Sequence, residues 1–316
     1  MKPKILVIGS ANTDMVIKAE HLPQPGETIL GGTFFMNPGG KGANQAVAAA
    51  RLNGSVIFIG KTGNDIFGRQ SIELFEEEGI NTKYMVSDPK HPSGVALIAV
   101  DKHGENCIVV ASGANATLVP ADLQKAEDEI KNAAIVLMQL EVPVETVEWV
   151  AAVAASNNVR VMLNPAPACA LPASLMKNIS VITPNKTEAE MLSGIKVTNL
   201  ETAIQAGKII KEKGVETVII TLGIKGALVI KDTIIEMIPA RAVEAVDTTA
   251  AGDVFNGALA VSLSEGVDIL DAVAFACHAA AISVTKMGAQ SSAPYRSEVQ
   301  IIQESFVKKE TPVINK

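Results

Sequence analysis

Short, uninterrupted apolar runs recur along the chain, and stretches with a helical spacing of apolar residues separate most of them. A strand that is apolar at every position is typical of a parallel sheet, because such a sheet is covered on both faces. The apolar runs are residues 4–9, 55–60, 134–138, 159–163, 180–183, 217–221 and 226–230. The helical stretches are residues 43–52, 68–78, 120–131, 144–156 and 200–213. This alternation predicts an α/β fold with a doubly wound, mostly parallel sheet flanked by helices.

Two segments interrupt the alternation, because they contain short β-like runs and no helical period. They are residues 14–35 and 93–112. In the second segment, residues 93–100 and 106–110 flank Asp101-Lys-His-Gly104, and this pattern predicts a β-hairpin.

The first segment is expected to form a similar pair, with residues 28–30 and 33–35 on either side of Gly31-Gly32. We therefore expect one domain, residues 1–316, that carries a small antiparallel β lid. The lid would be formed by about residues 13–36 and 92–112. A sheet of this size cannot bury both faces by itself, so the lid should cover a cleft or a partner subunit.

Charge and composition exclude several classes of protein. The chain has 27 Lys and Arg against 34 Asp and Glu, and with a net charge of −7 it offers no basic stripe for a phosphate backbone. The uncharged segment 272–285 is too short to span a membrane, and prolines interrupt the apolar segment 161–176. The three cysteines form no CxxC pair, which argues against a disulfide framework or a zinc site. We expect a soluble cytoplasmic protein that binds neither nucleic acid nor membranes.

A turn of small residues leads into a helix near the C-terminus. Apolar residues after Asp253 follow a helical spacing, so Thr249-Ala-Ala-Gly252 is expected to precede the first turn. Small side chains leave the backbone N–H groups open there, and a helix N-terminus with open N–H groups attracts anions. The alternative is that Asp253 is a common first-turn acid or N-cap with no further role.

A glycine cluster, Asn37-Pro-Gly-Gly-Lys-Gly-Ala-Asn44, leads into the alanine-rich helix. It is not a Walker A loop, because Gly42 rather than Ser or Thr follows Lys41. Its glycines would let the backbone approach a small polar ligand, with Lys41 and Asn44 as donors. Taken alone, a tight turn before a helix explains the cluster better. The GxGxxG turn of a nicotinamide-dependent oxidoreductase does not follow the first strand.

Polar residues follow several predicted strands, at the edge where open parallel sheets bind ligands. Asn12 and Asp14 follow the first strand and offer the groups that bind sugar hydroxyls, the alternative being an Asx turn. Glu141 follows another strand, where a solvated acid is equally common. Asn185 and Glu188 are spaced as a capping box, or they bring a carboxylate near a hydrated Mg²⁺.

Two further segments carry candidate ligand contacts. Thr221-Leu-Gly-Ile-Lys-Gly226 is a strand-to-turn element whose glycines leave room for a nucleotide. Residues 277–292 combine a helix with a polar segment, and exposed carbonyls at such a helix end can bind a cation. Each signal is weak alone, but the strand-end clusters converge on the carboxyl edge of one predicted sheet.

Two of these motifs occur together about 200 residues apart, a combination that is highly specific. They are Gly39-Gly-Lys-Gly-Ala-Asn-Gln-Ala46 and Asp247-Thr-Thr-Ala-Ala-Gly-Asp253. On these residues the chain resembles the ribokinase subgroup of the PfkB carbohydrate kinase family, along nearly its whole length. The resemblance implies transfer of the γ-phosphoryl group of ATP to the O5 hydroxyl of D-ribose.

The resemblance also implies roles for single residues. Asp253 would accept the hydroxyl proton, and an anion hole would stabilise the transferred phosphoryl group. The N–H groups of that hole belong to Ala250, Ala251 and Gly252. The sugar would contact Asn12, Asp14, Gly40, Lys41, Gly42, Asn44, Glu141 and Asp253. The nucleotide would lie along Asn185, Thr221, Gly223, Lys225, Gly226, Gly252 and Cys277.

Two metal ions and a homodimer follow from the same resemblance. Mg²⁺ would accompany ATP and be held through water near Asn185 and Glu188. K⁺ would lie beside the anion hole, with Asp247, Thr249, Ser283, Lys286, Gly288 and Ser292 as ligands. The lids of two subunits would pair. Cys277 and Ser291 depart from the residues common in the family, and these departures concern the nucleotide contacts only.

Other activities use similar residues. A kinase for 2-deoxyribose or for a nucleoside such as adenosine would share the chemistry. Asn12 and Asp14 favour ribose because together they can satisfy its 2- and 3-hydroxyls, whereas Phe34 and Phe35 could stack on a base. A sugar-binding regulator, or a kinase without activity, would need neither Asp253 nor the residues before it.

Overall fold

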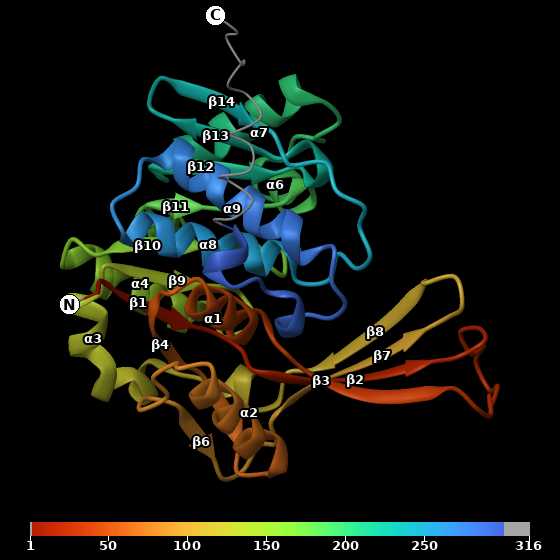
Figure 1. Ribbon diagram of the computed structural model, residues 1–316. Coiled ribbons are helices and arrows are strands. Elements are labelled where there is room, and N and C mark those ends of the chain that lie inside the picture. The colour runs from red at the N-terminus through yellow and green to blue at the C-terminus, as the bar shows by residue number, and fades with distance from the viewer. Residues whose placement is uncertain (1, 300–316) are drawn as a thin grey trace, which may run out of the picture.

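The central element is an eight-stranded sheet with the order β14-β13-β12-β11-β10-β9-β1-β4 (Figure 1). The computed structural model describes residues 2–299. The parallel strands are β1 (Lys4–Ile8), β4 (Ser55–Ile59), β9 (Ile135–Met138), β10 (Arg160–Leu163), β11 (Val181–Ile182) and β12 (Thr217–Thr221). The antiparallel strands are β13 (Ala227–Lys231) and β14 (Ile234–Ile238). The prediction of a mostly parallel sheet is confirmed.

Helices cover both faces of this sheet. Successive side chains of a strand point to opposite faces, so a strand that is apolar throughout makes both faces of the sheet apolar. Ile5 and Val7 of β1 belong to one apolar core, and Leu6 and Ile8 belong to the other. The first core includes α1 (Lys41–Arg51), α8 (Ala251–Ser264) and α9 (Ile269–Ser283), and also Phe75 of α2 (Ile66–Glu77). The second includes α3 (Glu127–Asn132), α4 (Val144–Ser156), α5 (Ala173–Met176), α6 (Lys186–Ser193) and α7 (Leu200–Glu212). The sheet is therefore doubly wound, as predicted.

One predicted helix is divided in two. Residues 120–131 form a 3₁₀ segment, η2 (Pro120–Ala126), followed by α3. Pro120 at the first position has no N–H to donate, and Val119 before it is extended. Among residues 2–299, every helix is too short or too polar to cross a bilayer.

A second, four-stranded sheet extends away from the body of the molecule (Figure 1). Its order is β3 (Thr33–Gly39), β2 (Asn12–Lys18), β7 (Gly94–Val100) and β8 (Asn106–Ala111). The expected hairpin of β7 and β8 is present. The predicted pairing of residues 28–30 with 33–35 is wrong, because β3 pairs with β2 over seven residues. That longer ladder offers more hydrogen bonds than a three-residue strand.

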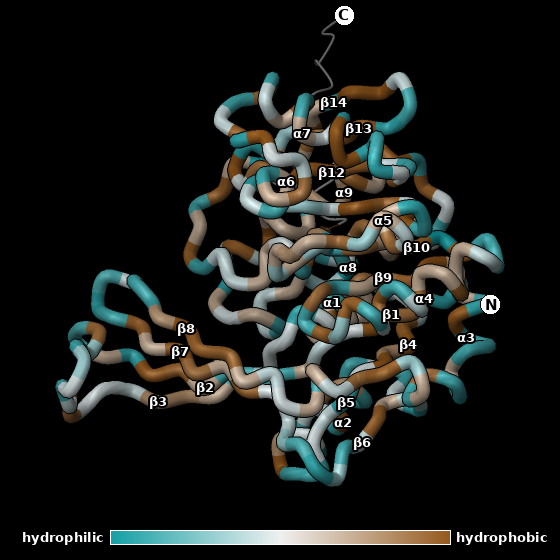
Figure 2. Tube along the Cα trace, turned by 180° about the vertical axis from the view of Figure 1, so that it is seen from behind, coloured by the Kyte–Doolittle hydropathy of each residue, from teal (hydrophilic) through white to brown (hydrophobic). Residues whose placement is uncertain are grey.

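Apolar residues line the strands of the four-stranded sheet, as the brown stretches in Figure 2 show. On one face of this sheet several of the apolar side chains are exposed. Residues paired across strands share a face, as do residues two apart on one strand. By this register the exposed face, which we call the outer lid face, carries Ile17, Phe34, Met36, Leu97 and Val109. The opposite face carries Asp14, which feels the charges of Glu141 and Asp253, and on β8 it also exposes Val110.

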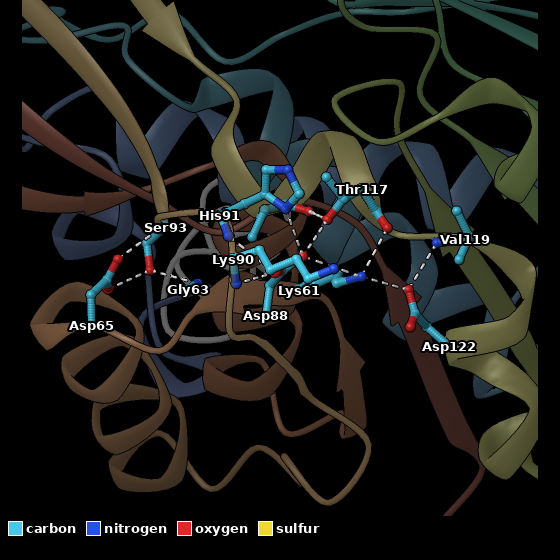
Figure 3. A network of polar contacts seen from close by, with 11 residues as sticks. Lys61, Gly63, Asp65, Asp88, Lys90, His91, Ser93, Thr117, Val119 and Asp122 are labelled. Carbon is cyan, nitrogen blue, oxygen red and sulfur yellow. Dashed lines mark hydrogen bonds and ion pairs between the residues drawn. The ribbon is translucent and has the colours of Figure 1, made fainter.

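A polar network joins this sheet to the body (Figure 3). Lys61 on β5 (Lys61–Gly63) donates to the carbonyl of Thr117 and to Asp122, both over 2.9 Å, and lies 3.5 Å from Asp88 at the end of β6 (Val86–Asp88). Asp65, the N-cap of α2, accepts hydrogen bonds from both the N–H and the hydroxyl of Ser93. The segments just before β7 and just after β8 are thus both tied to the same part of the body.

Candidate active site

The candidate site lies at the carboxyl edge of the large sheet, where the predicted residues gather from separate parts of the chain. Asp253 on α8 and Asn44 on α1 are joined by a hydrogen bond of 2.9 Å. The backbone N–H of Lys41 donates to Glu141, which follows β9, over 2.9 Å. Asp14 on β2 lies close enough to Glu141 and Asp253 to feel both charges. The structure therefore brings together the residues expected to hold the sugar.

Asp253 is a buried carboxylate that accepts two hydrogen bonds. Asn44 donates to Oδ2 over 2.9 Å, and Gln45 donates to Oδ1 over 3.0 Å. Burial raises the pKa of Asp253, while the charge of Lys41 and the two amides act in the opposite direction. Only 6% of the residue is exposed, so the carboxylate can be reached only from the site. A buried carboxylate with a raised pKa is well suited to accept a proton.

The N-terminus of α8 begins beside this carboxylate. Ala250 is its N-cap and has a left-handed backbone, with φ of 58°. No side chain caps the helix, because alanine has no side-chain oxygen to accept a hydrogen bond. A β-carbon added at Gly252 would meet nothing within 4 Å, which leaves the first turn open to a ligand. In this conformation the N–H of Ala251 donates to the carbonyl of Thr248 over 3.3 Å. An open helix N-terminus favours a phosphate group through its dipole and its unpaired N–H groups.

The site raises the pKa of Asp14. Burial raises its pKa to about 6, and the negative charges of Glu141 and Asp253 add to the effect. Gly39 is required beside it, because a β-carbon there would overlap the carboxyl group of Asp14. Gly40 has φ of 90°, and a β-carbon would lie 2.8 Å from the backbone nitrogen of Asn12. The glycine cluster therefore lets the backbone pass close to two polar side chains.

Lys41 is the cation of the site. Burial acts to lower its pKa, but the negative charges of Asp253, Glu141 and Glu188 outweigh burial and raise it. The ammonium group therefore stays charged and partly balances a cluster of carboxylates. A fixed positive charge in this position suits a ligand that carries phosphate.

Asn185 and Glu188 form the capping box that was one of the two predicted alternatives. The N–H of Glu188 donates to Asn185 Oδ1 over 2.9 Å, and both oxygens of Glu188 accept hydrogen bonds from Asn185. Burial raises the pKa of Glu188, against the hydrogen bond from Asn185 and the charge of Lys41. Residues 2–299 contain no cluster of three or more His, Cys, Asp or Glu placed to hold a metal ion.

The expected nucleotide residues come from several elements: the start of α6, the end of β12 and the turn after it, α8 and α9. Asn185 and Thr221 form a parallel bridge, so the ends of β11 and β12 adjoin. Gly223 and Gly226 have φ of 59° and 101°, and the turn between them leaves Lys225 exposed. Cys277 lies on α9, where burial raises the pKa of its thiol to about 12. That thiol stays protonated at neutral pH and serves as a small apolar group.

Two of the expected K⁺ ligands, Thr249 and Gly288, contact a third, Asp247. Its two carboxylate oxygens accept hydrogen bonds of 2.9 Å from the N–H groups of Thr249 and Gly288. Its own N–H donates to the carbonyl of Val284, over 3.1 Å, at the end of α9. These contacts bring Asp247 next to Val284 and Gly288, in the segment that follows α9. Of the other expected ligands, Ser283 ends α9, Lys286 lies in the same segment as Gly288, and Ser292 ends the 3₁₀ turn η4 (Gln290–Ser292).

Comparison with known proteins shows the family of the chain. The model of the pfkB family of carbohydrate kinases matches residues 2–296. The chain belongs to this family. It is 45% identical over 298 residues to a Haemophilus influenzae ribokinase, covering 94% of this chain and 97% of the relative. It is 40% identical over 291 residues to a Salmonella typhimurium deoxyribokinase, covering 92% and 95%.

Solved structures of the pfkB family share the fold. A structure of Arabidopsis thaliana ribokinase complexed with ribose and ATP matches with a TM-score of 0.91 and 33% identity. The match covers 96% of this chain and 99% of that one. The family predicted from the two signatures and the fold predicted from the alternation of strands and helices are both confirmed.

Sequence reasoning missed several buried amides in this pfkB-family chain. Gln45, Gln139 and Asn164 lie beneath the site and are joined by hydrogen bonds. Asn115 donates to Oδ1 of Asn12 over 2.8 Å, which leaves the NH₂ group of Asn12 for a ligand. Gln45 stood inside a signature, and Gln139 and Asn164 each follow an apolar run; these positions were the available signals.

Proposed function

We propose that the chain transfers the γ-phosphoryl group of ATP to O5 of D-ribose, giving D-ribose 5-phosphate and ADP. One observation carries the proposal: the Asp253 carboxylate is buried at the open N-terminus of α8 and bonded to a residue expected to hold the sugar. The Arabidopsis ribokinase with ribose and ATP, and the ribokinase of H. influenzae, support the choice of substrates.

In this proposal Asp253 accepts the proton of the O5 hydroxyl as that oxygen bonds to the γ-phosphorus and the bond to the β-phosphate oxygen breaks. The N–H groups of Ala250, Ala251 and Gly252 stabilise the charge on the transferred group, the last two from the first turn of α8. The N–H of Ala251 would exchange its weak bond to Thr248 for the phosphoryl oxygen. Loss of the base is expected to lower kcat by about 10² to 10⁴-fold.

The sugar is held by side chains that differ in hydrogen-bonding type. Asn12 presents NH₂ donors because Asn115 holds its oxygen, and Asp14 presents acceptors. Such a pair suits two neighbouring hydroxyls, and a sugar lacking one would leave a polar group unpaired. The other proposed contacts are Gly40, Lys41, Gly42, Asn44, Glu141 and Asp253.

The nucleotide is proposed to lie along Asn185, the turn of residues 221–226, Gly252 and Cys277. Glu188 is proposed to contact Mg²⁺ through water, with each of its oxygens keeping a lone pair beyond the hydrogen bond from Asn185. The carboxylate and carbonyl oxygens around Asp247 are hard donors that fit K⁺. When bound, Mg²⁺ would neutralise phosphate charge and K⁺ would fix the loop before α8.

We also propose that the four-stranded sheet is a lid and that two copies of the chain pair through the outer lid face. That face exposes five large apolar side chains on one sheet, more than isolated surface residues explain. The proposed place of action is the cytoplasm, where ATP is available.

A second substrate has a specific observation in its favour. The deoxyribokinase of S. typhimurium is 40% identical to this chain, close to the 45% of the H. influenzae ribokinase. 2-Deoxyribose is therefore the alternative substrate for the same chemistry.

The deciding experiment measures ADP production from ATP and Mg²⁺ with D-ribose, 2-deoxyribose and adenosine, with and without K⁺. D-Ribose-dependent turnover, stimulated by K⁺ and lost in Asp253→Ala, is the expected result. Glu129→Ala removes a carboxylate paired with Lys4 on the other face of the sheet and should leave turnover unchanged. Turnover with another sugar would mean that this sugar, and not D-ribose, is the substrate. Binding of ribose without any turnover would indicate a sugar sensor.

A further inference from the structure

Gln45 is a fully buried glutamine whose amide is saturated with hydrogen bonds. Its Nε2 donates to Asp253 Oδ1 over 3.0 Å and to Asn164 Oδ1 over 3.1 Å. Its Oε1 accepts from Gln139 Nε2 over 2.6 Å. Gln45 and Gln139 are both 0% exposed, so neither can touch a ligand in the site. Among the hydrogen-bond partners of the Gln45 side chain, Asp253 is the one that belongs to the candidate site.

The network fixes which way the Gln45 amide points. If the amide were turned over, its oxygen would face the oxygens of Asp253 and Asn164, and its NH₂ would face the NH₂ of Gln139. The bonds thus have one direction, from Gln139 to Gln45 to Asp253. Asp253 and Asn164 fix this orientation, because both present oxygens to Nε2 of Gln45, and Oε1 of Gln45 is then left to accept from Gln139. Oε1 of Gln139 itself has no hydrogen-bond partner among the described residues.

Asn44 and Gln45 hold Asp253 in different ways. Asn44 donates to Oδ2 and belongs to the proposed sugar contacts, so its bonding changes when the sugar binds. Gln45 donates to Oδ1 from the protein interior, so its bond persists with or without substrate. A donor on a carboxylate oxygen favours the charged form, which burial of Asp253 otherwise disfavours.

We propose that Gln45, hydrogen-bonded to Gln139, is a positioning residue that holds Oδ1 of Asp253 and keeps the carboxylate ionised and aimed at the sugar hydroxyl. The inference rests on the proposed role of Asp253 as the base. The proton of O5 moves to Asp253, and Gln45 gives up none. Hydrogen bonds to charged groups are stronger than neutral ones, and their loss is expected to lower kcat about 10- to 100-fold.

The test is the pH dependence of kcat in Gln45→Met, which keeps the length of the side chain and removes its donors. We expect kcat to fall about 10- to 100-fold, KM for D-ribose to change less than about threefold, and the acidic limb of the profile to move to higher pH. The other ionisable groups that face Asp253 are Lys41, Glu141, Asp14 and Glu188, and the variant alters none of them. The limb of kcat reports the complex with substrate, in which the sugar covers Asp14.

Gln139→Met is the second variant, because it removes only the donor to Oε1 of Gln45. The acidic limb of its kcat profile should also move to higher pH, but by less than in Gln45→Met. If Gln45→Met does not fold, Gln139→Met becomes the test. Thr146→Val is the matched control, since Thr146 is equally buried and bonded to the carbonyl of Leu118 on the other face of the sheet. Its pH profile should match that of the wild type.

A folded variant of Gln45 or Gln139 with a normal kcat and an unmoved acidic limb would overturn the inference. The same limb shift in Thr146→Val would also overturn it, because the shift would then reflect general loosening. If Asp253→Ala itself retained activity, the proposed function would fail first, and the two failures are therefore distinguishable.

Discussion

Replacing Asp14 by Asn should make the protein without substrate more stable. The pKa of Asp14 is about 6 in the folded protein against an ordinary value of 3.8, because of burial and the charges of Glu141 and Asp253. At about 1.4 kcal/mol for each pKa unit, ionised Asp14 costs the folded state about 3 kcal/mol at pH 7. Asparagine has the same shape and no charge, so the variant avoids this cost.

The sign of the pH dependence follows from the raised pKa. The folded protein binds the proton of Asp14 more tightly than the unfolded chain does, so the cost is absent well below pH 3.8 and complete above about pH 6. The stability gained by Asp14→Asn should therefore grow from about 1.5 kcal/mol at pH 5 to about 3 kcal/mol at pH 7.5. For a chain of 316 residues, 3 kcal/mol raises Tm by about 3 to 5 °C.

Thermal unfolding at pH 5 and at pH 7.5, without sugar or nucleotide, measures this difference. Asp65→Asn is the control of opposite sign. Although partial burial acts to raise the pKa of Asp65, hydrogen bonds from Ser93 and Gly68 hold it below its usual value, so its loss should lower Tm at both pH values. An Asp14→Asn protein that melts no higher than the wild type, or with a gain equal at both pH values, would refute the reasoning.

Three further predictions concern other parts of the structure. Asn185→Ala removes the cap on the N–H of Glu188 and should lower the free energy of unfolding in urea by about 1 kcal/mol; an unchanged value would mean that the capping box adds no stability. Gly257→Ala places a β-carbon 2.7 Å from the carbonyl oxygen of Gln45 and should lower the free energy of unfolding in urea by about 1 to 3 kcal/mol, because α8 packs against α1 there. An unchanged free energy would mean that the two helices can move apart without cost. Val109→Lys places a charge on the outer lid face and should shift the chain towards a monomer in analytical ultracentrifugation; a retained dimer would contradict pairing through that face.

Much of the large sheet could be predicted because burial on both faces leaves a continuous apolar run in the sequence. The run 217–221 coincides with β12 for this reason. The four-stranded sheet was harder to predict, because β2 contains Asn12 and Asp14 and is defined by pairing with β7, far along the chain. Residues 28–30 looked equally β-like but have no partner strand within the described part of the chain.

In the candidate site, too, residues with a local sequence pattern could be predicted, and residues that depend on distant contacts could not. Asp253 and Lys41 were found because their neighbours form rare combinations of small residues and glycines. Gln139 was missed because a glutamine after an apolar run looks like the start of any loop. Its proposed role depends on a hydrogen bond to Gln45, which lies 94 residues away in the sequence, and no local pattern records that contact.

The two hydrogen bonds to Asp253 also determine when the site can first exist. They join residues separated by 209 and 208 positions, so Asn44 and Gln45 are made early during synthesis and Asp253 late. Until α8 has been made and has docked, α1 carries two amides without the acceptor they have in the native state. Contacts of such separation form late, because they must close a long loop. During refolding, recovery of the site should therefore lag behind formation of the parallel strands, and activity would report the last stage of folding.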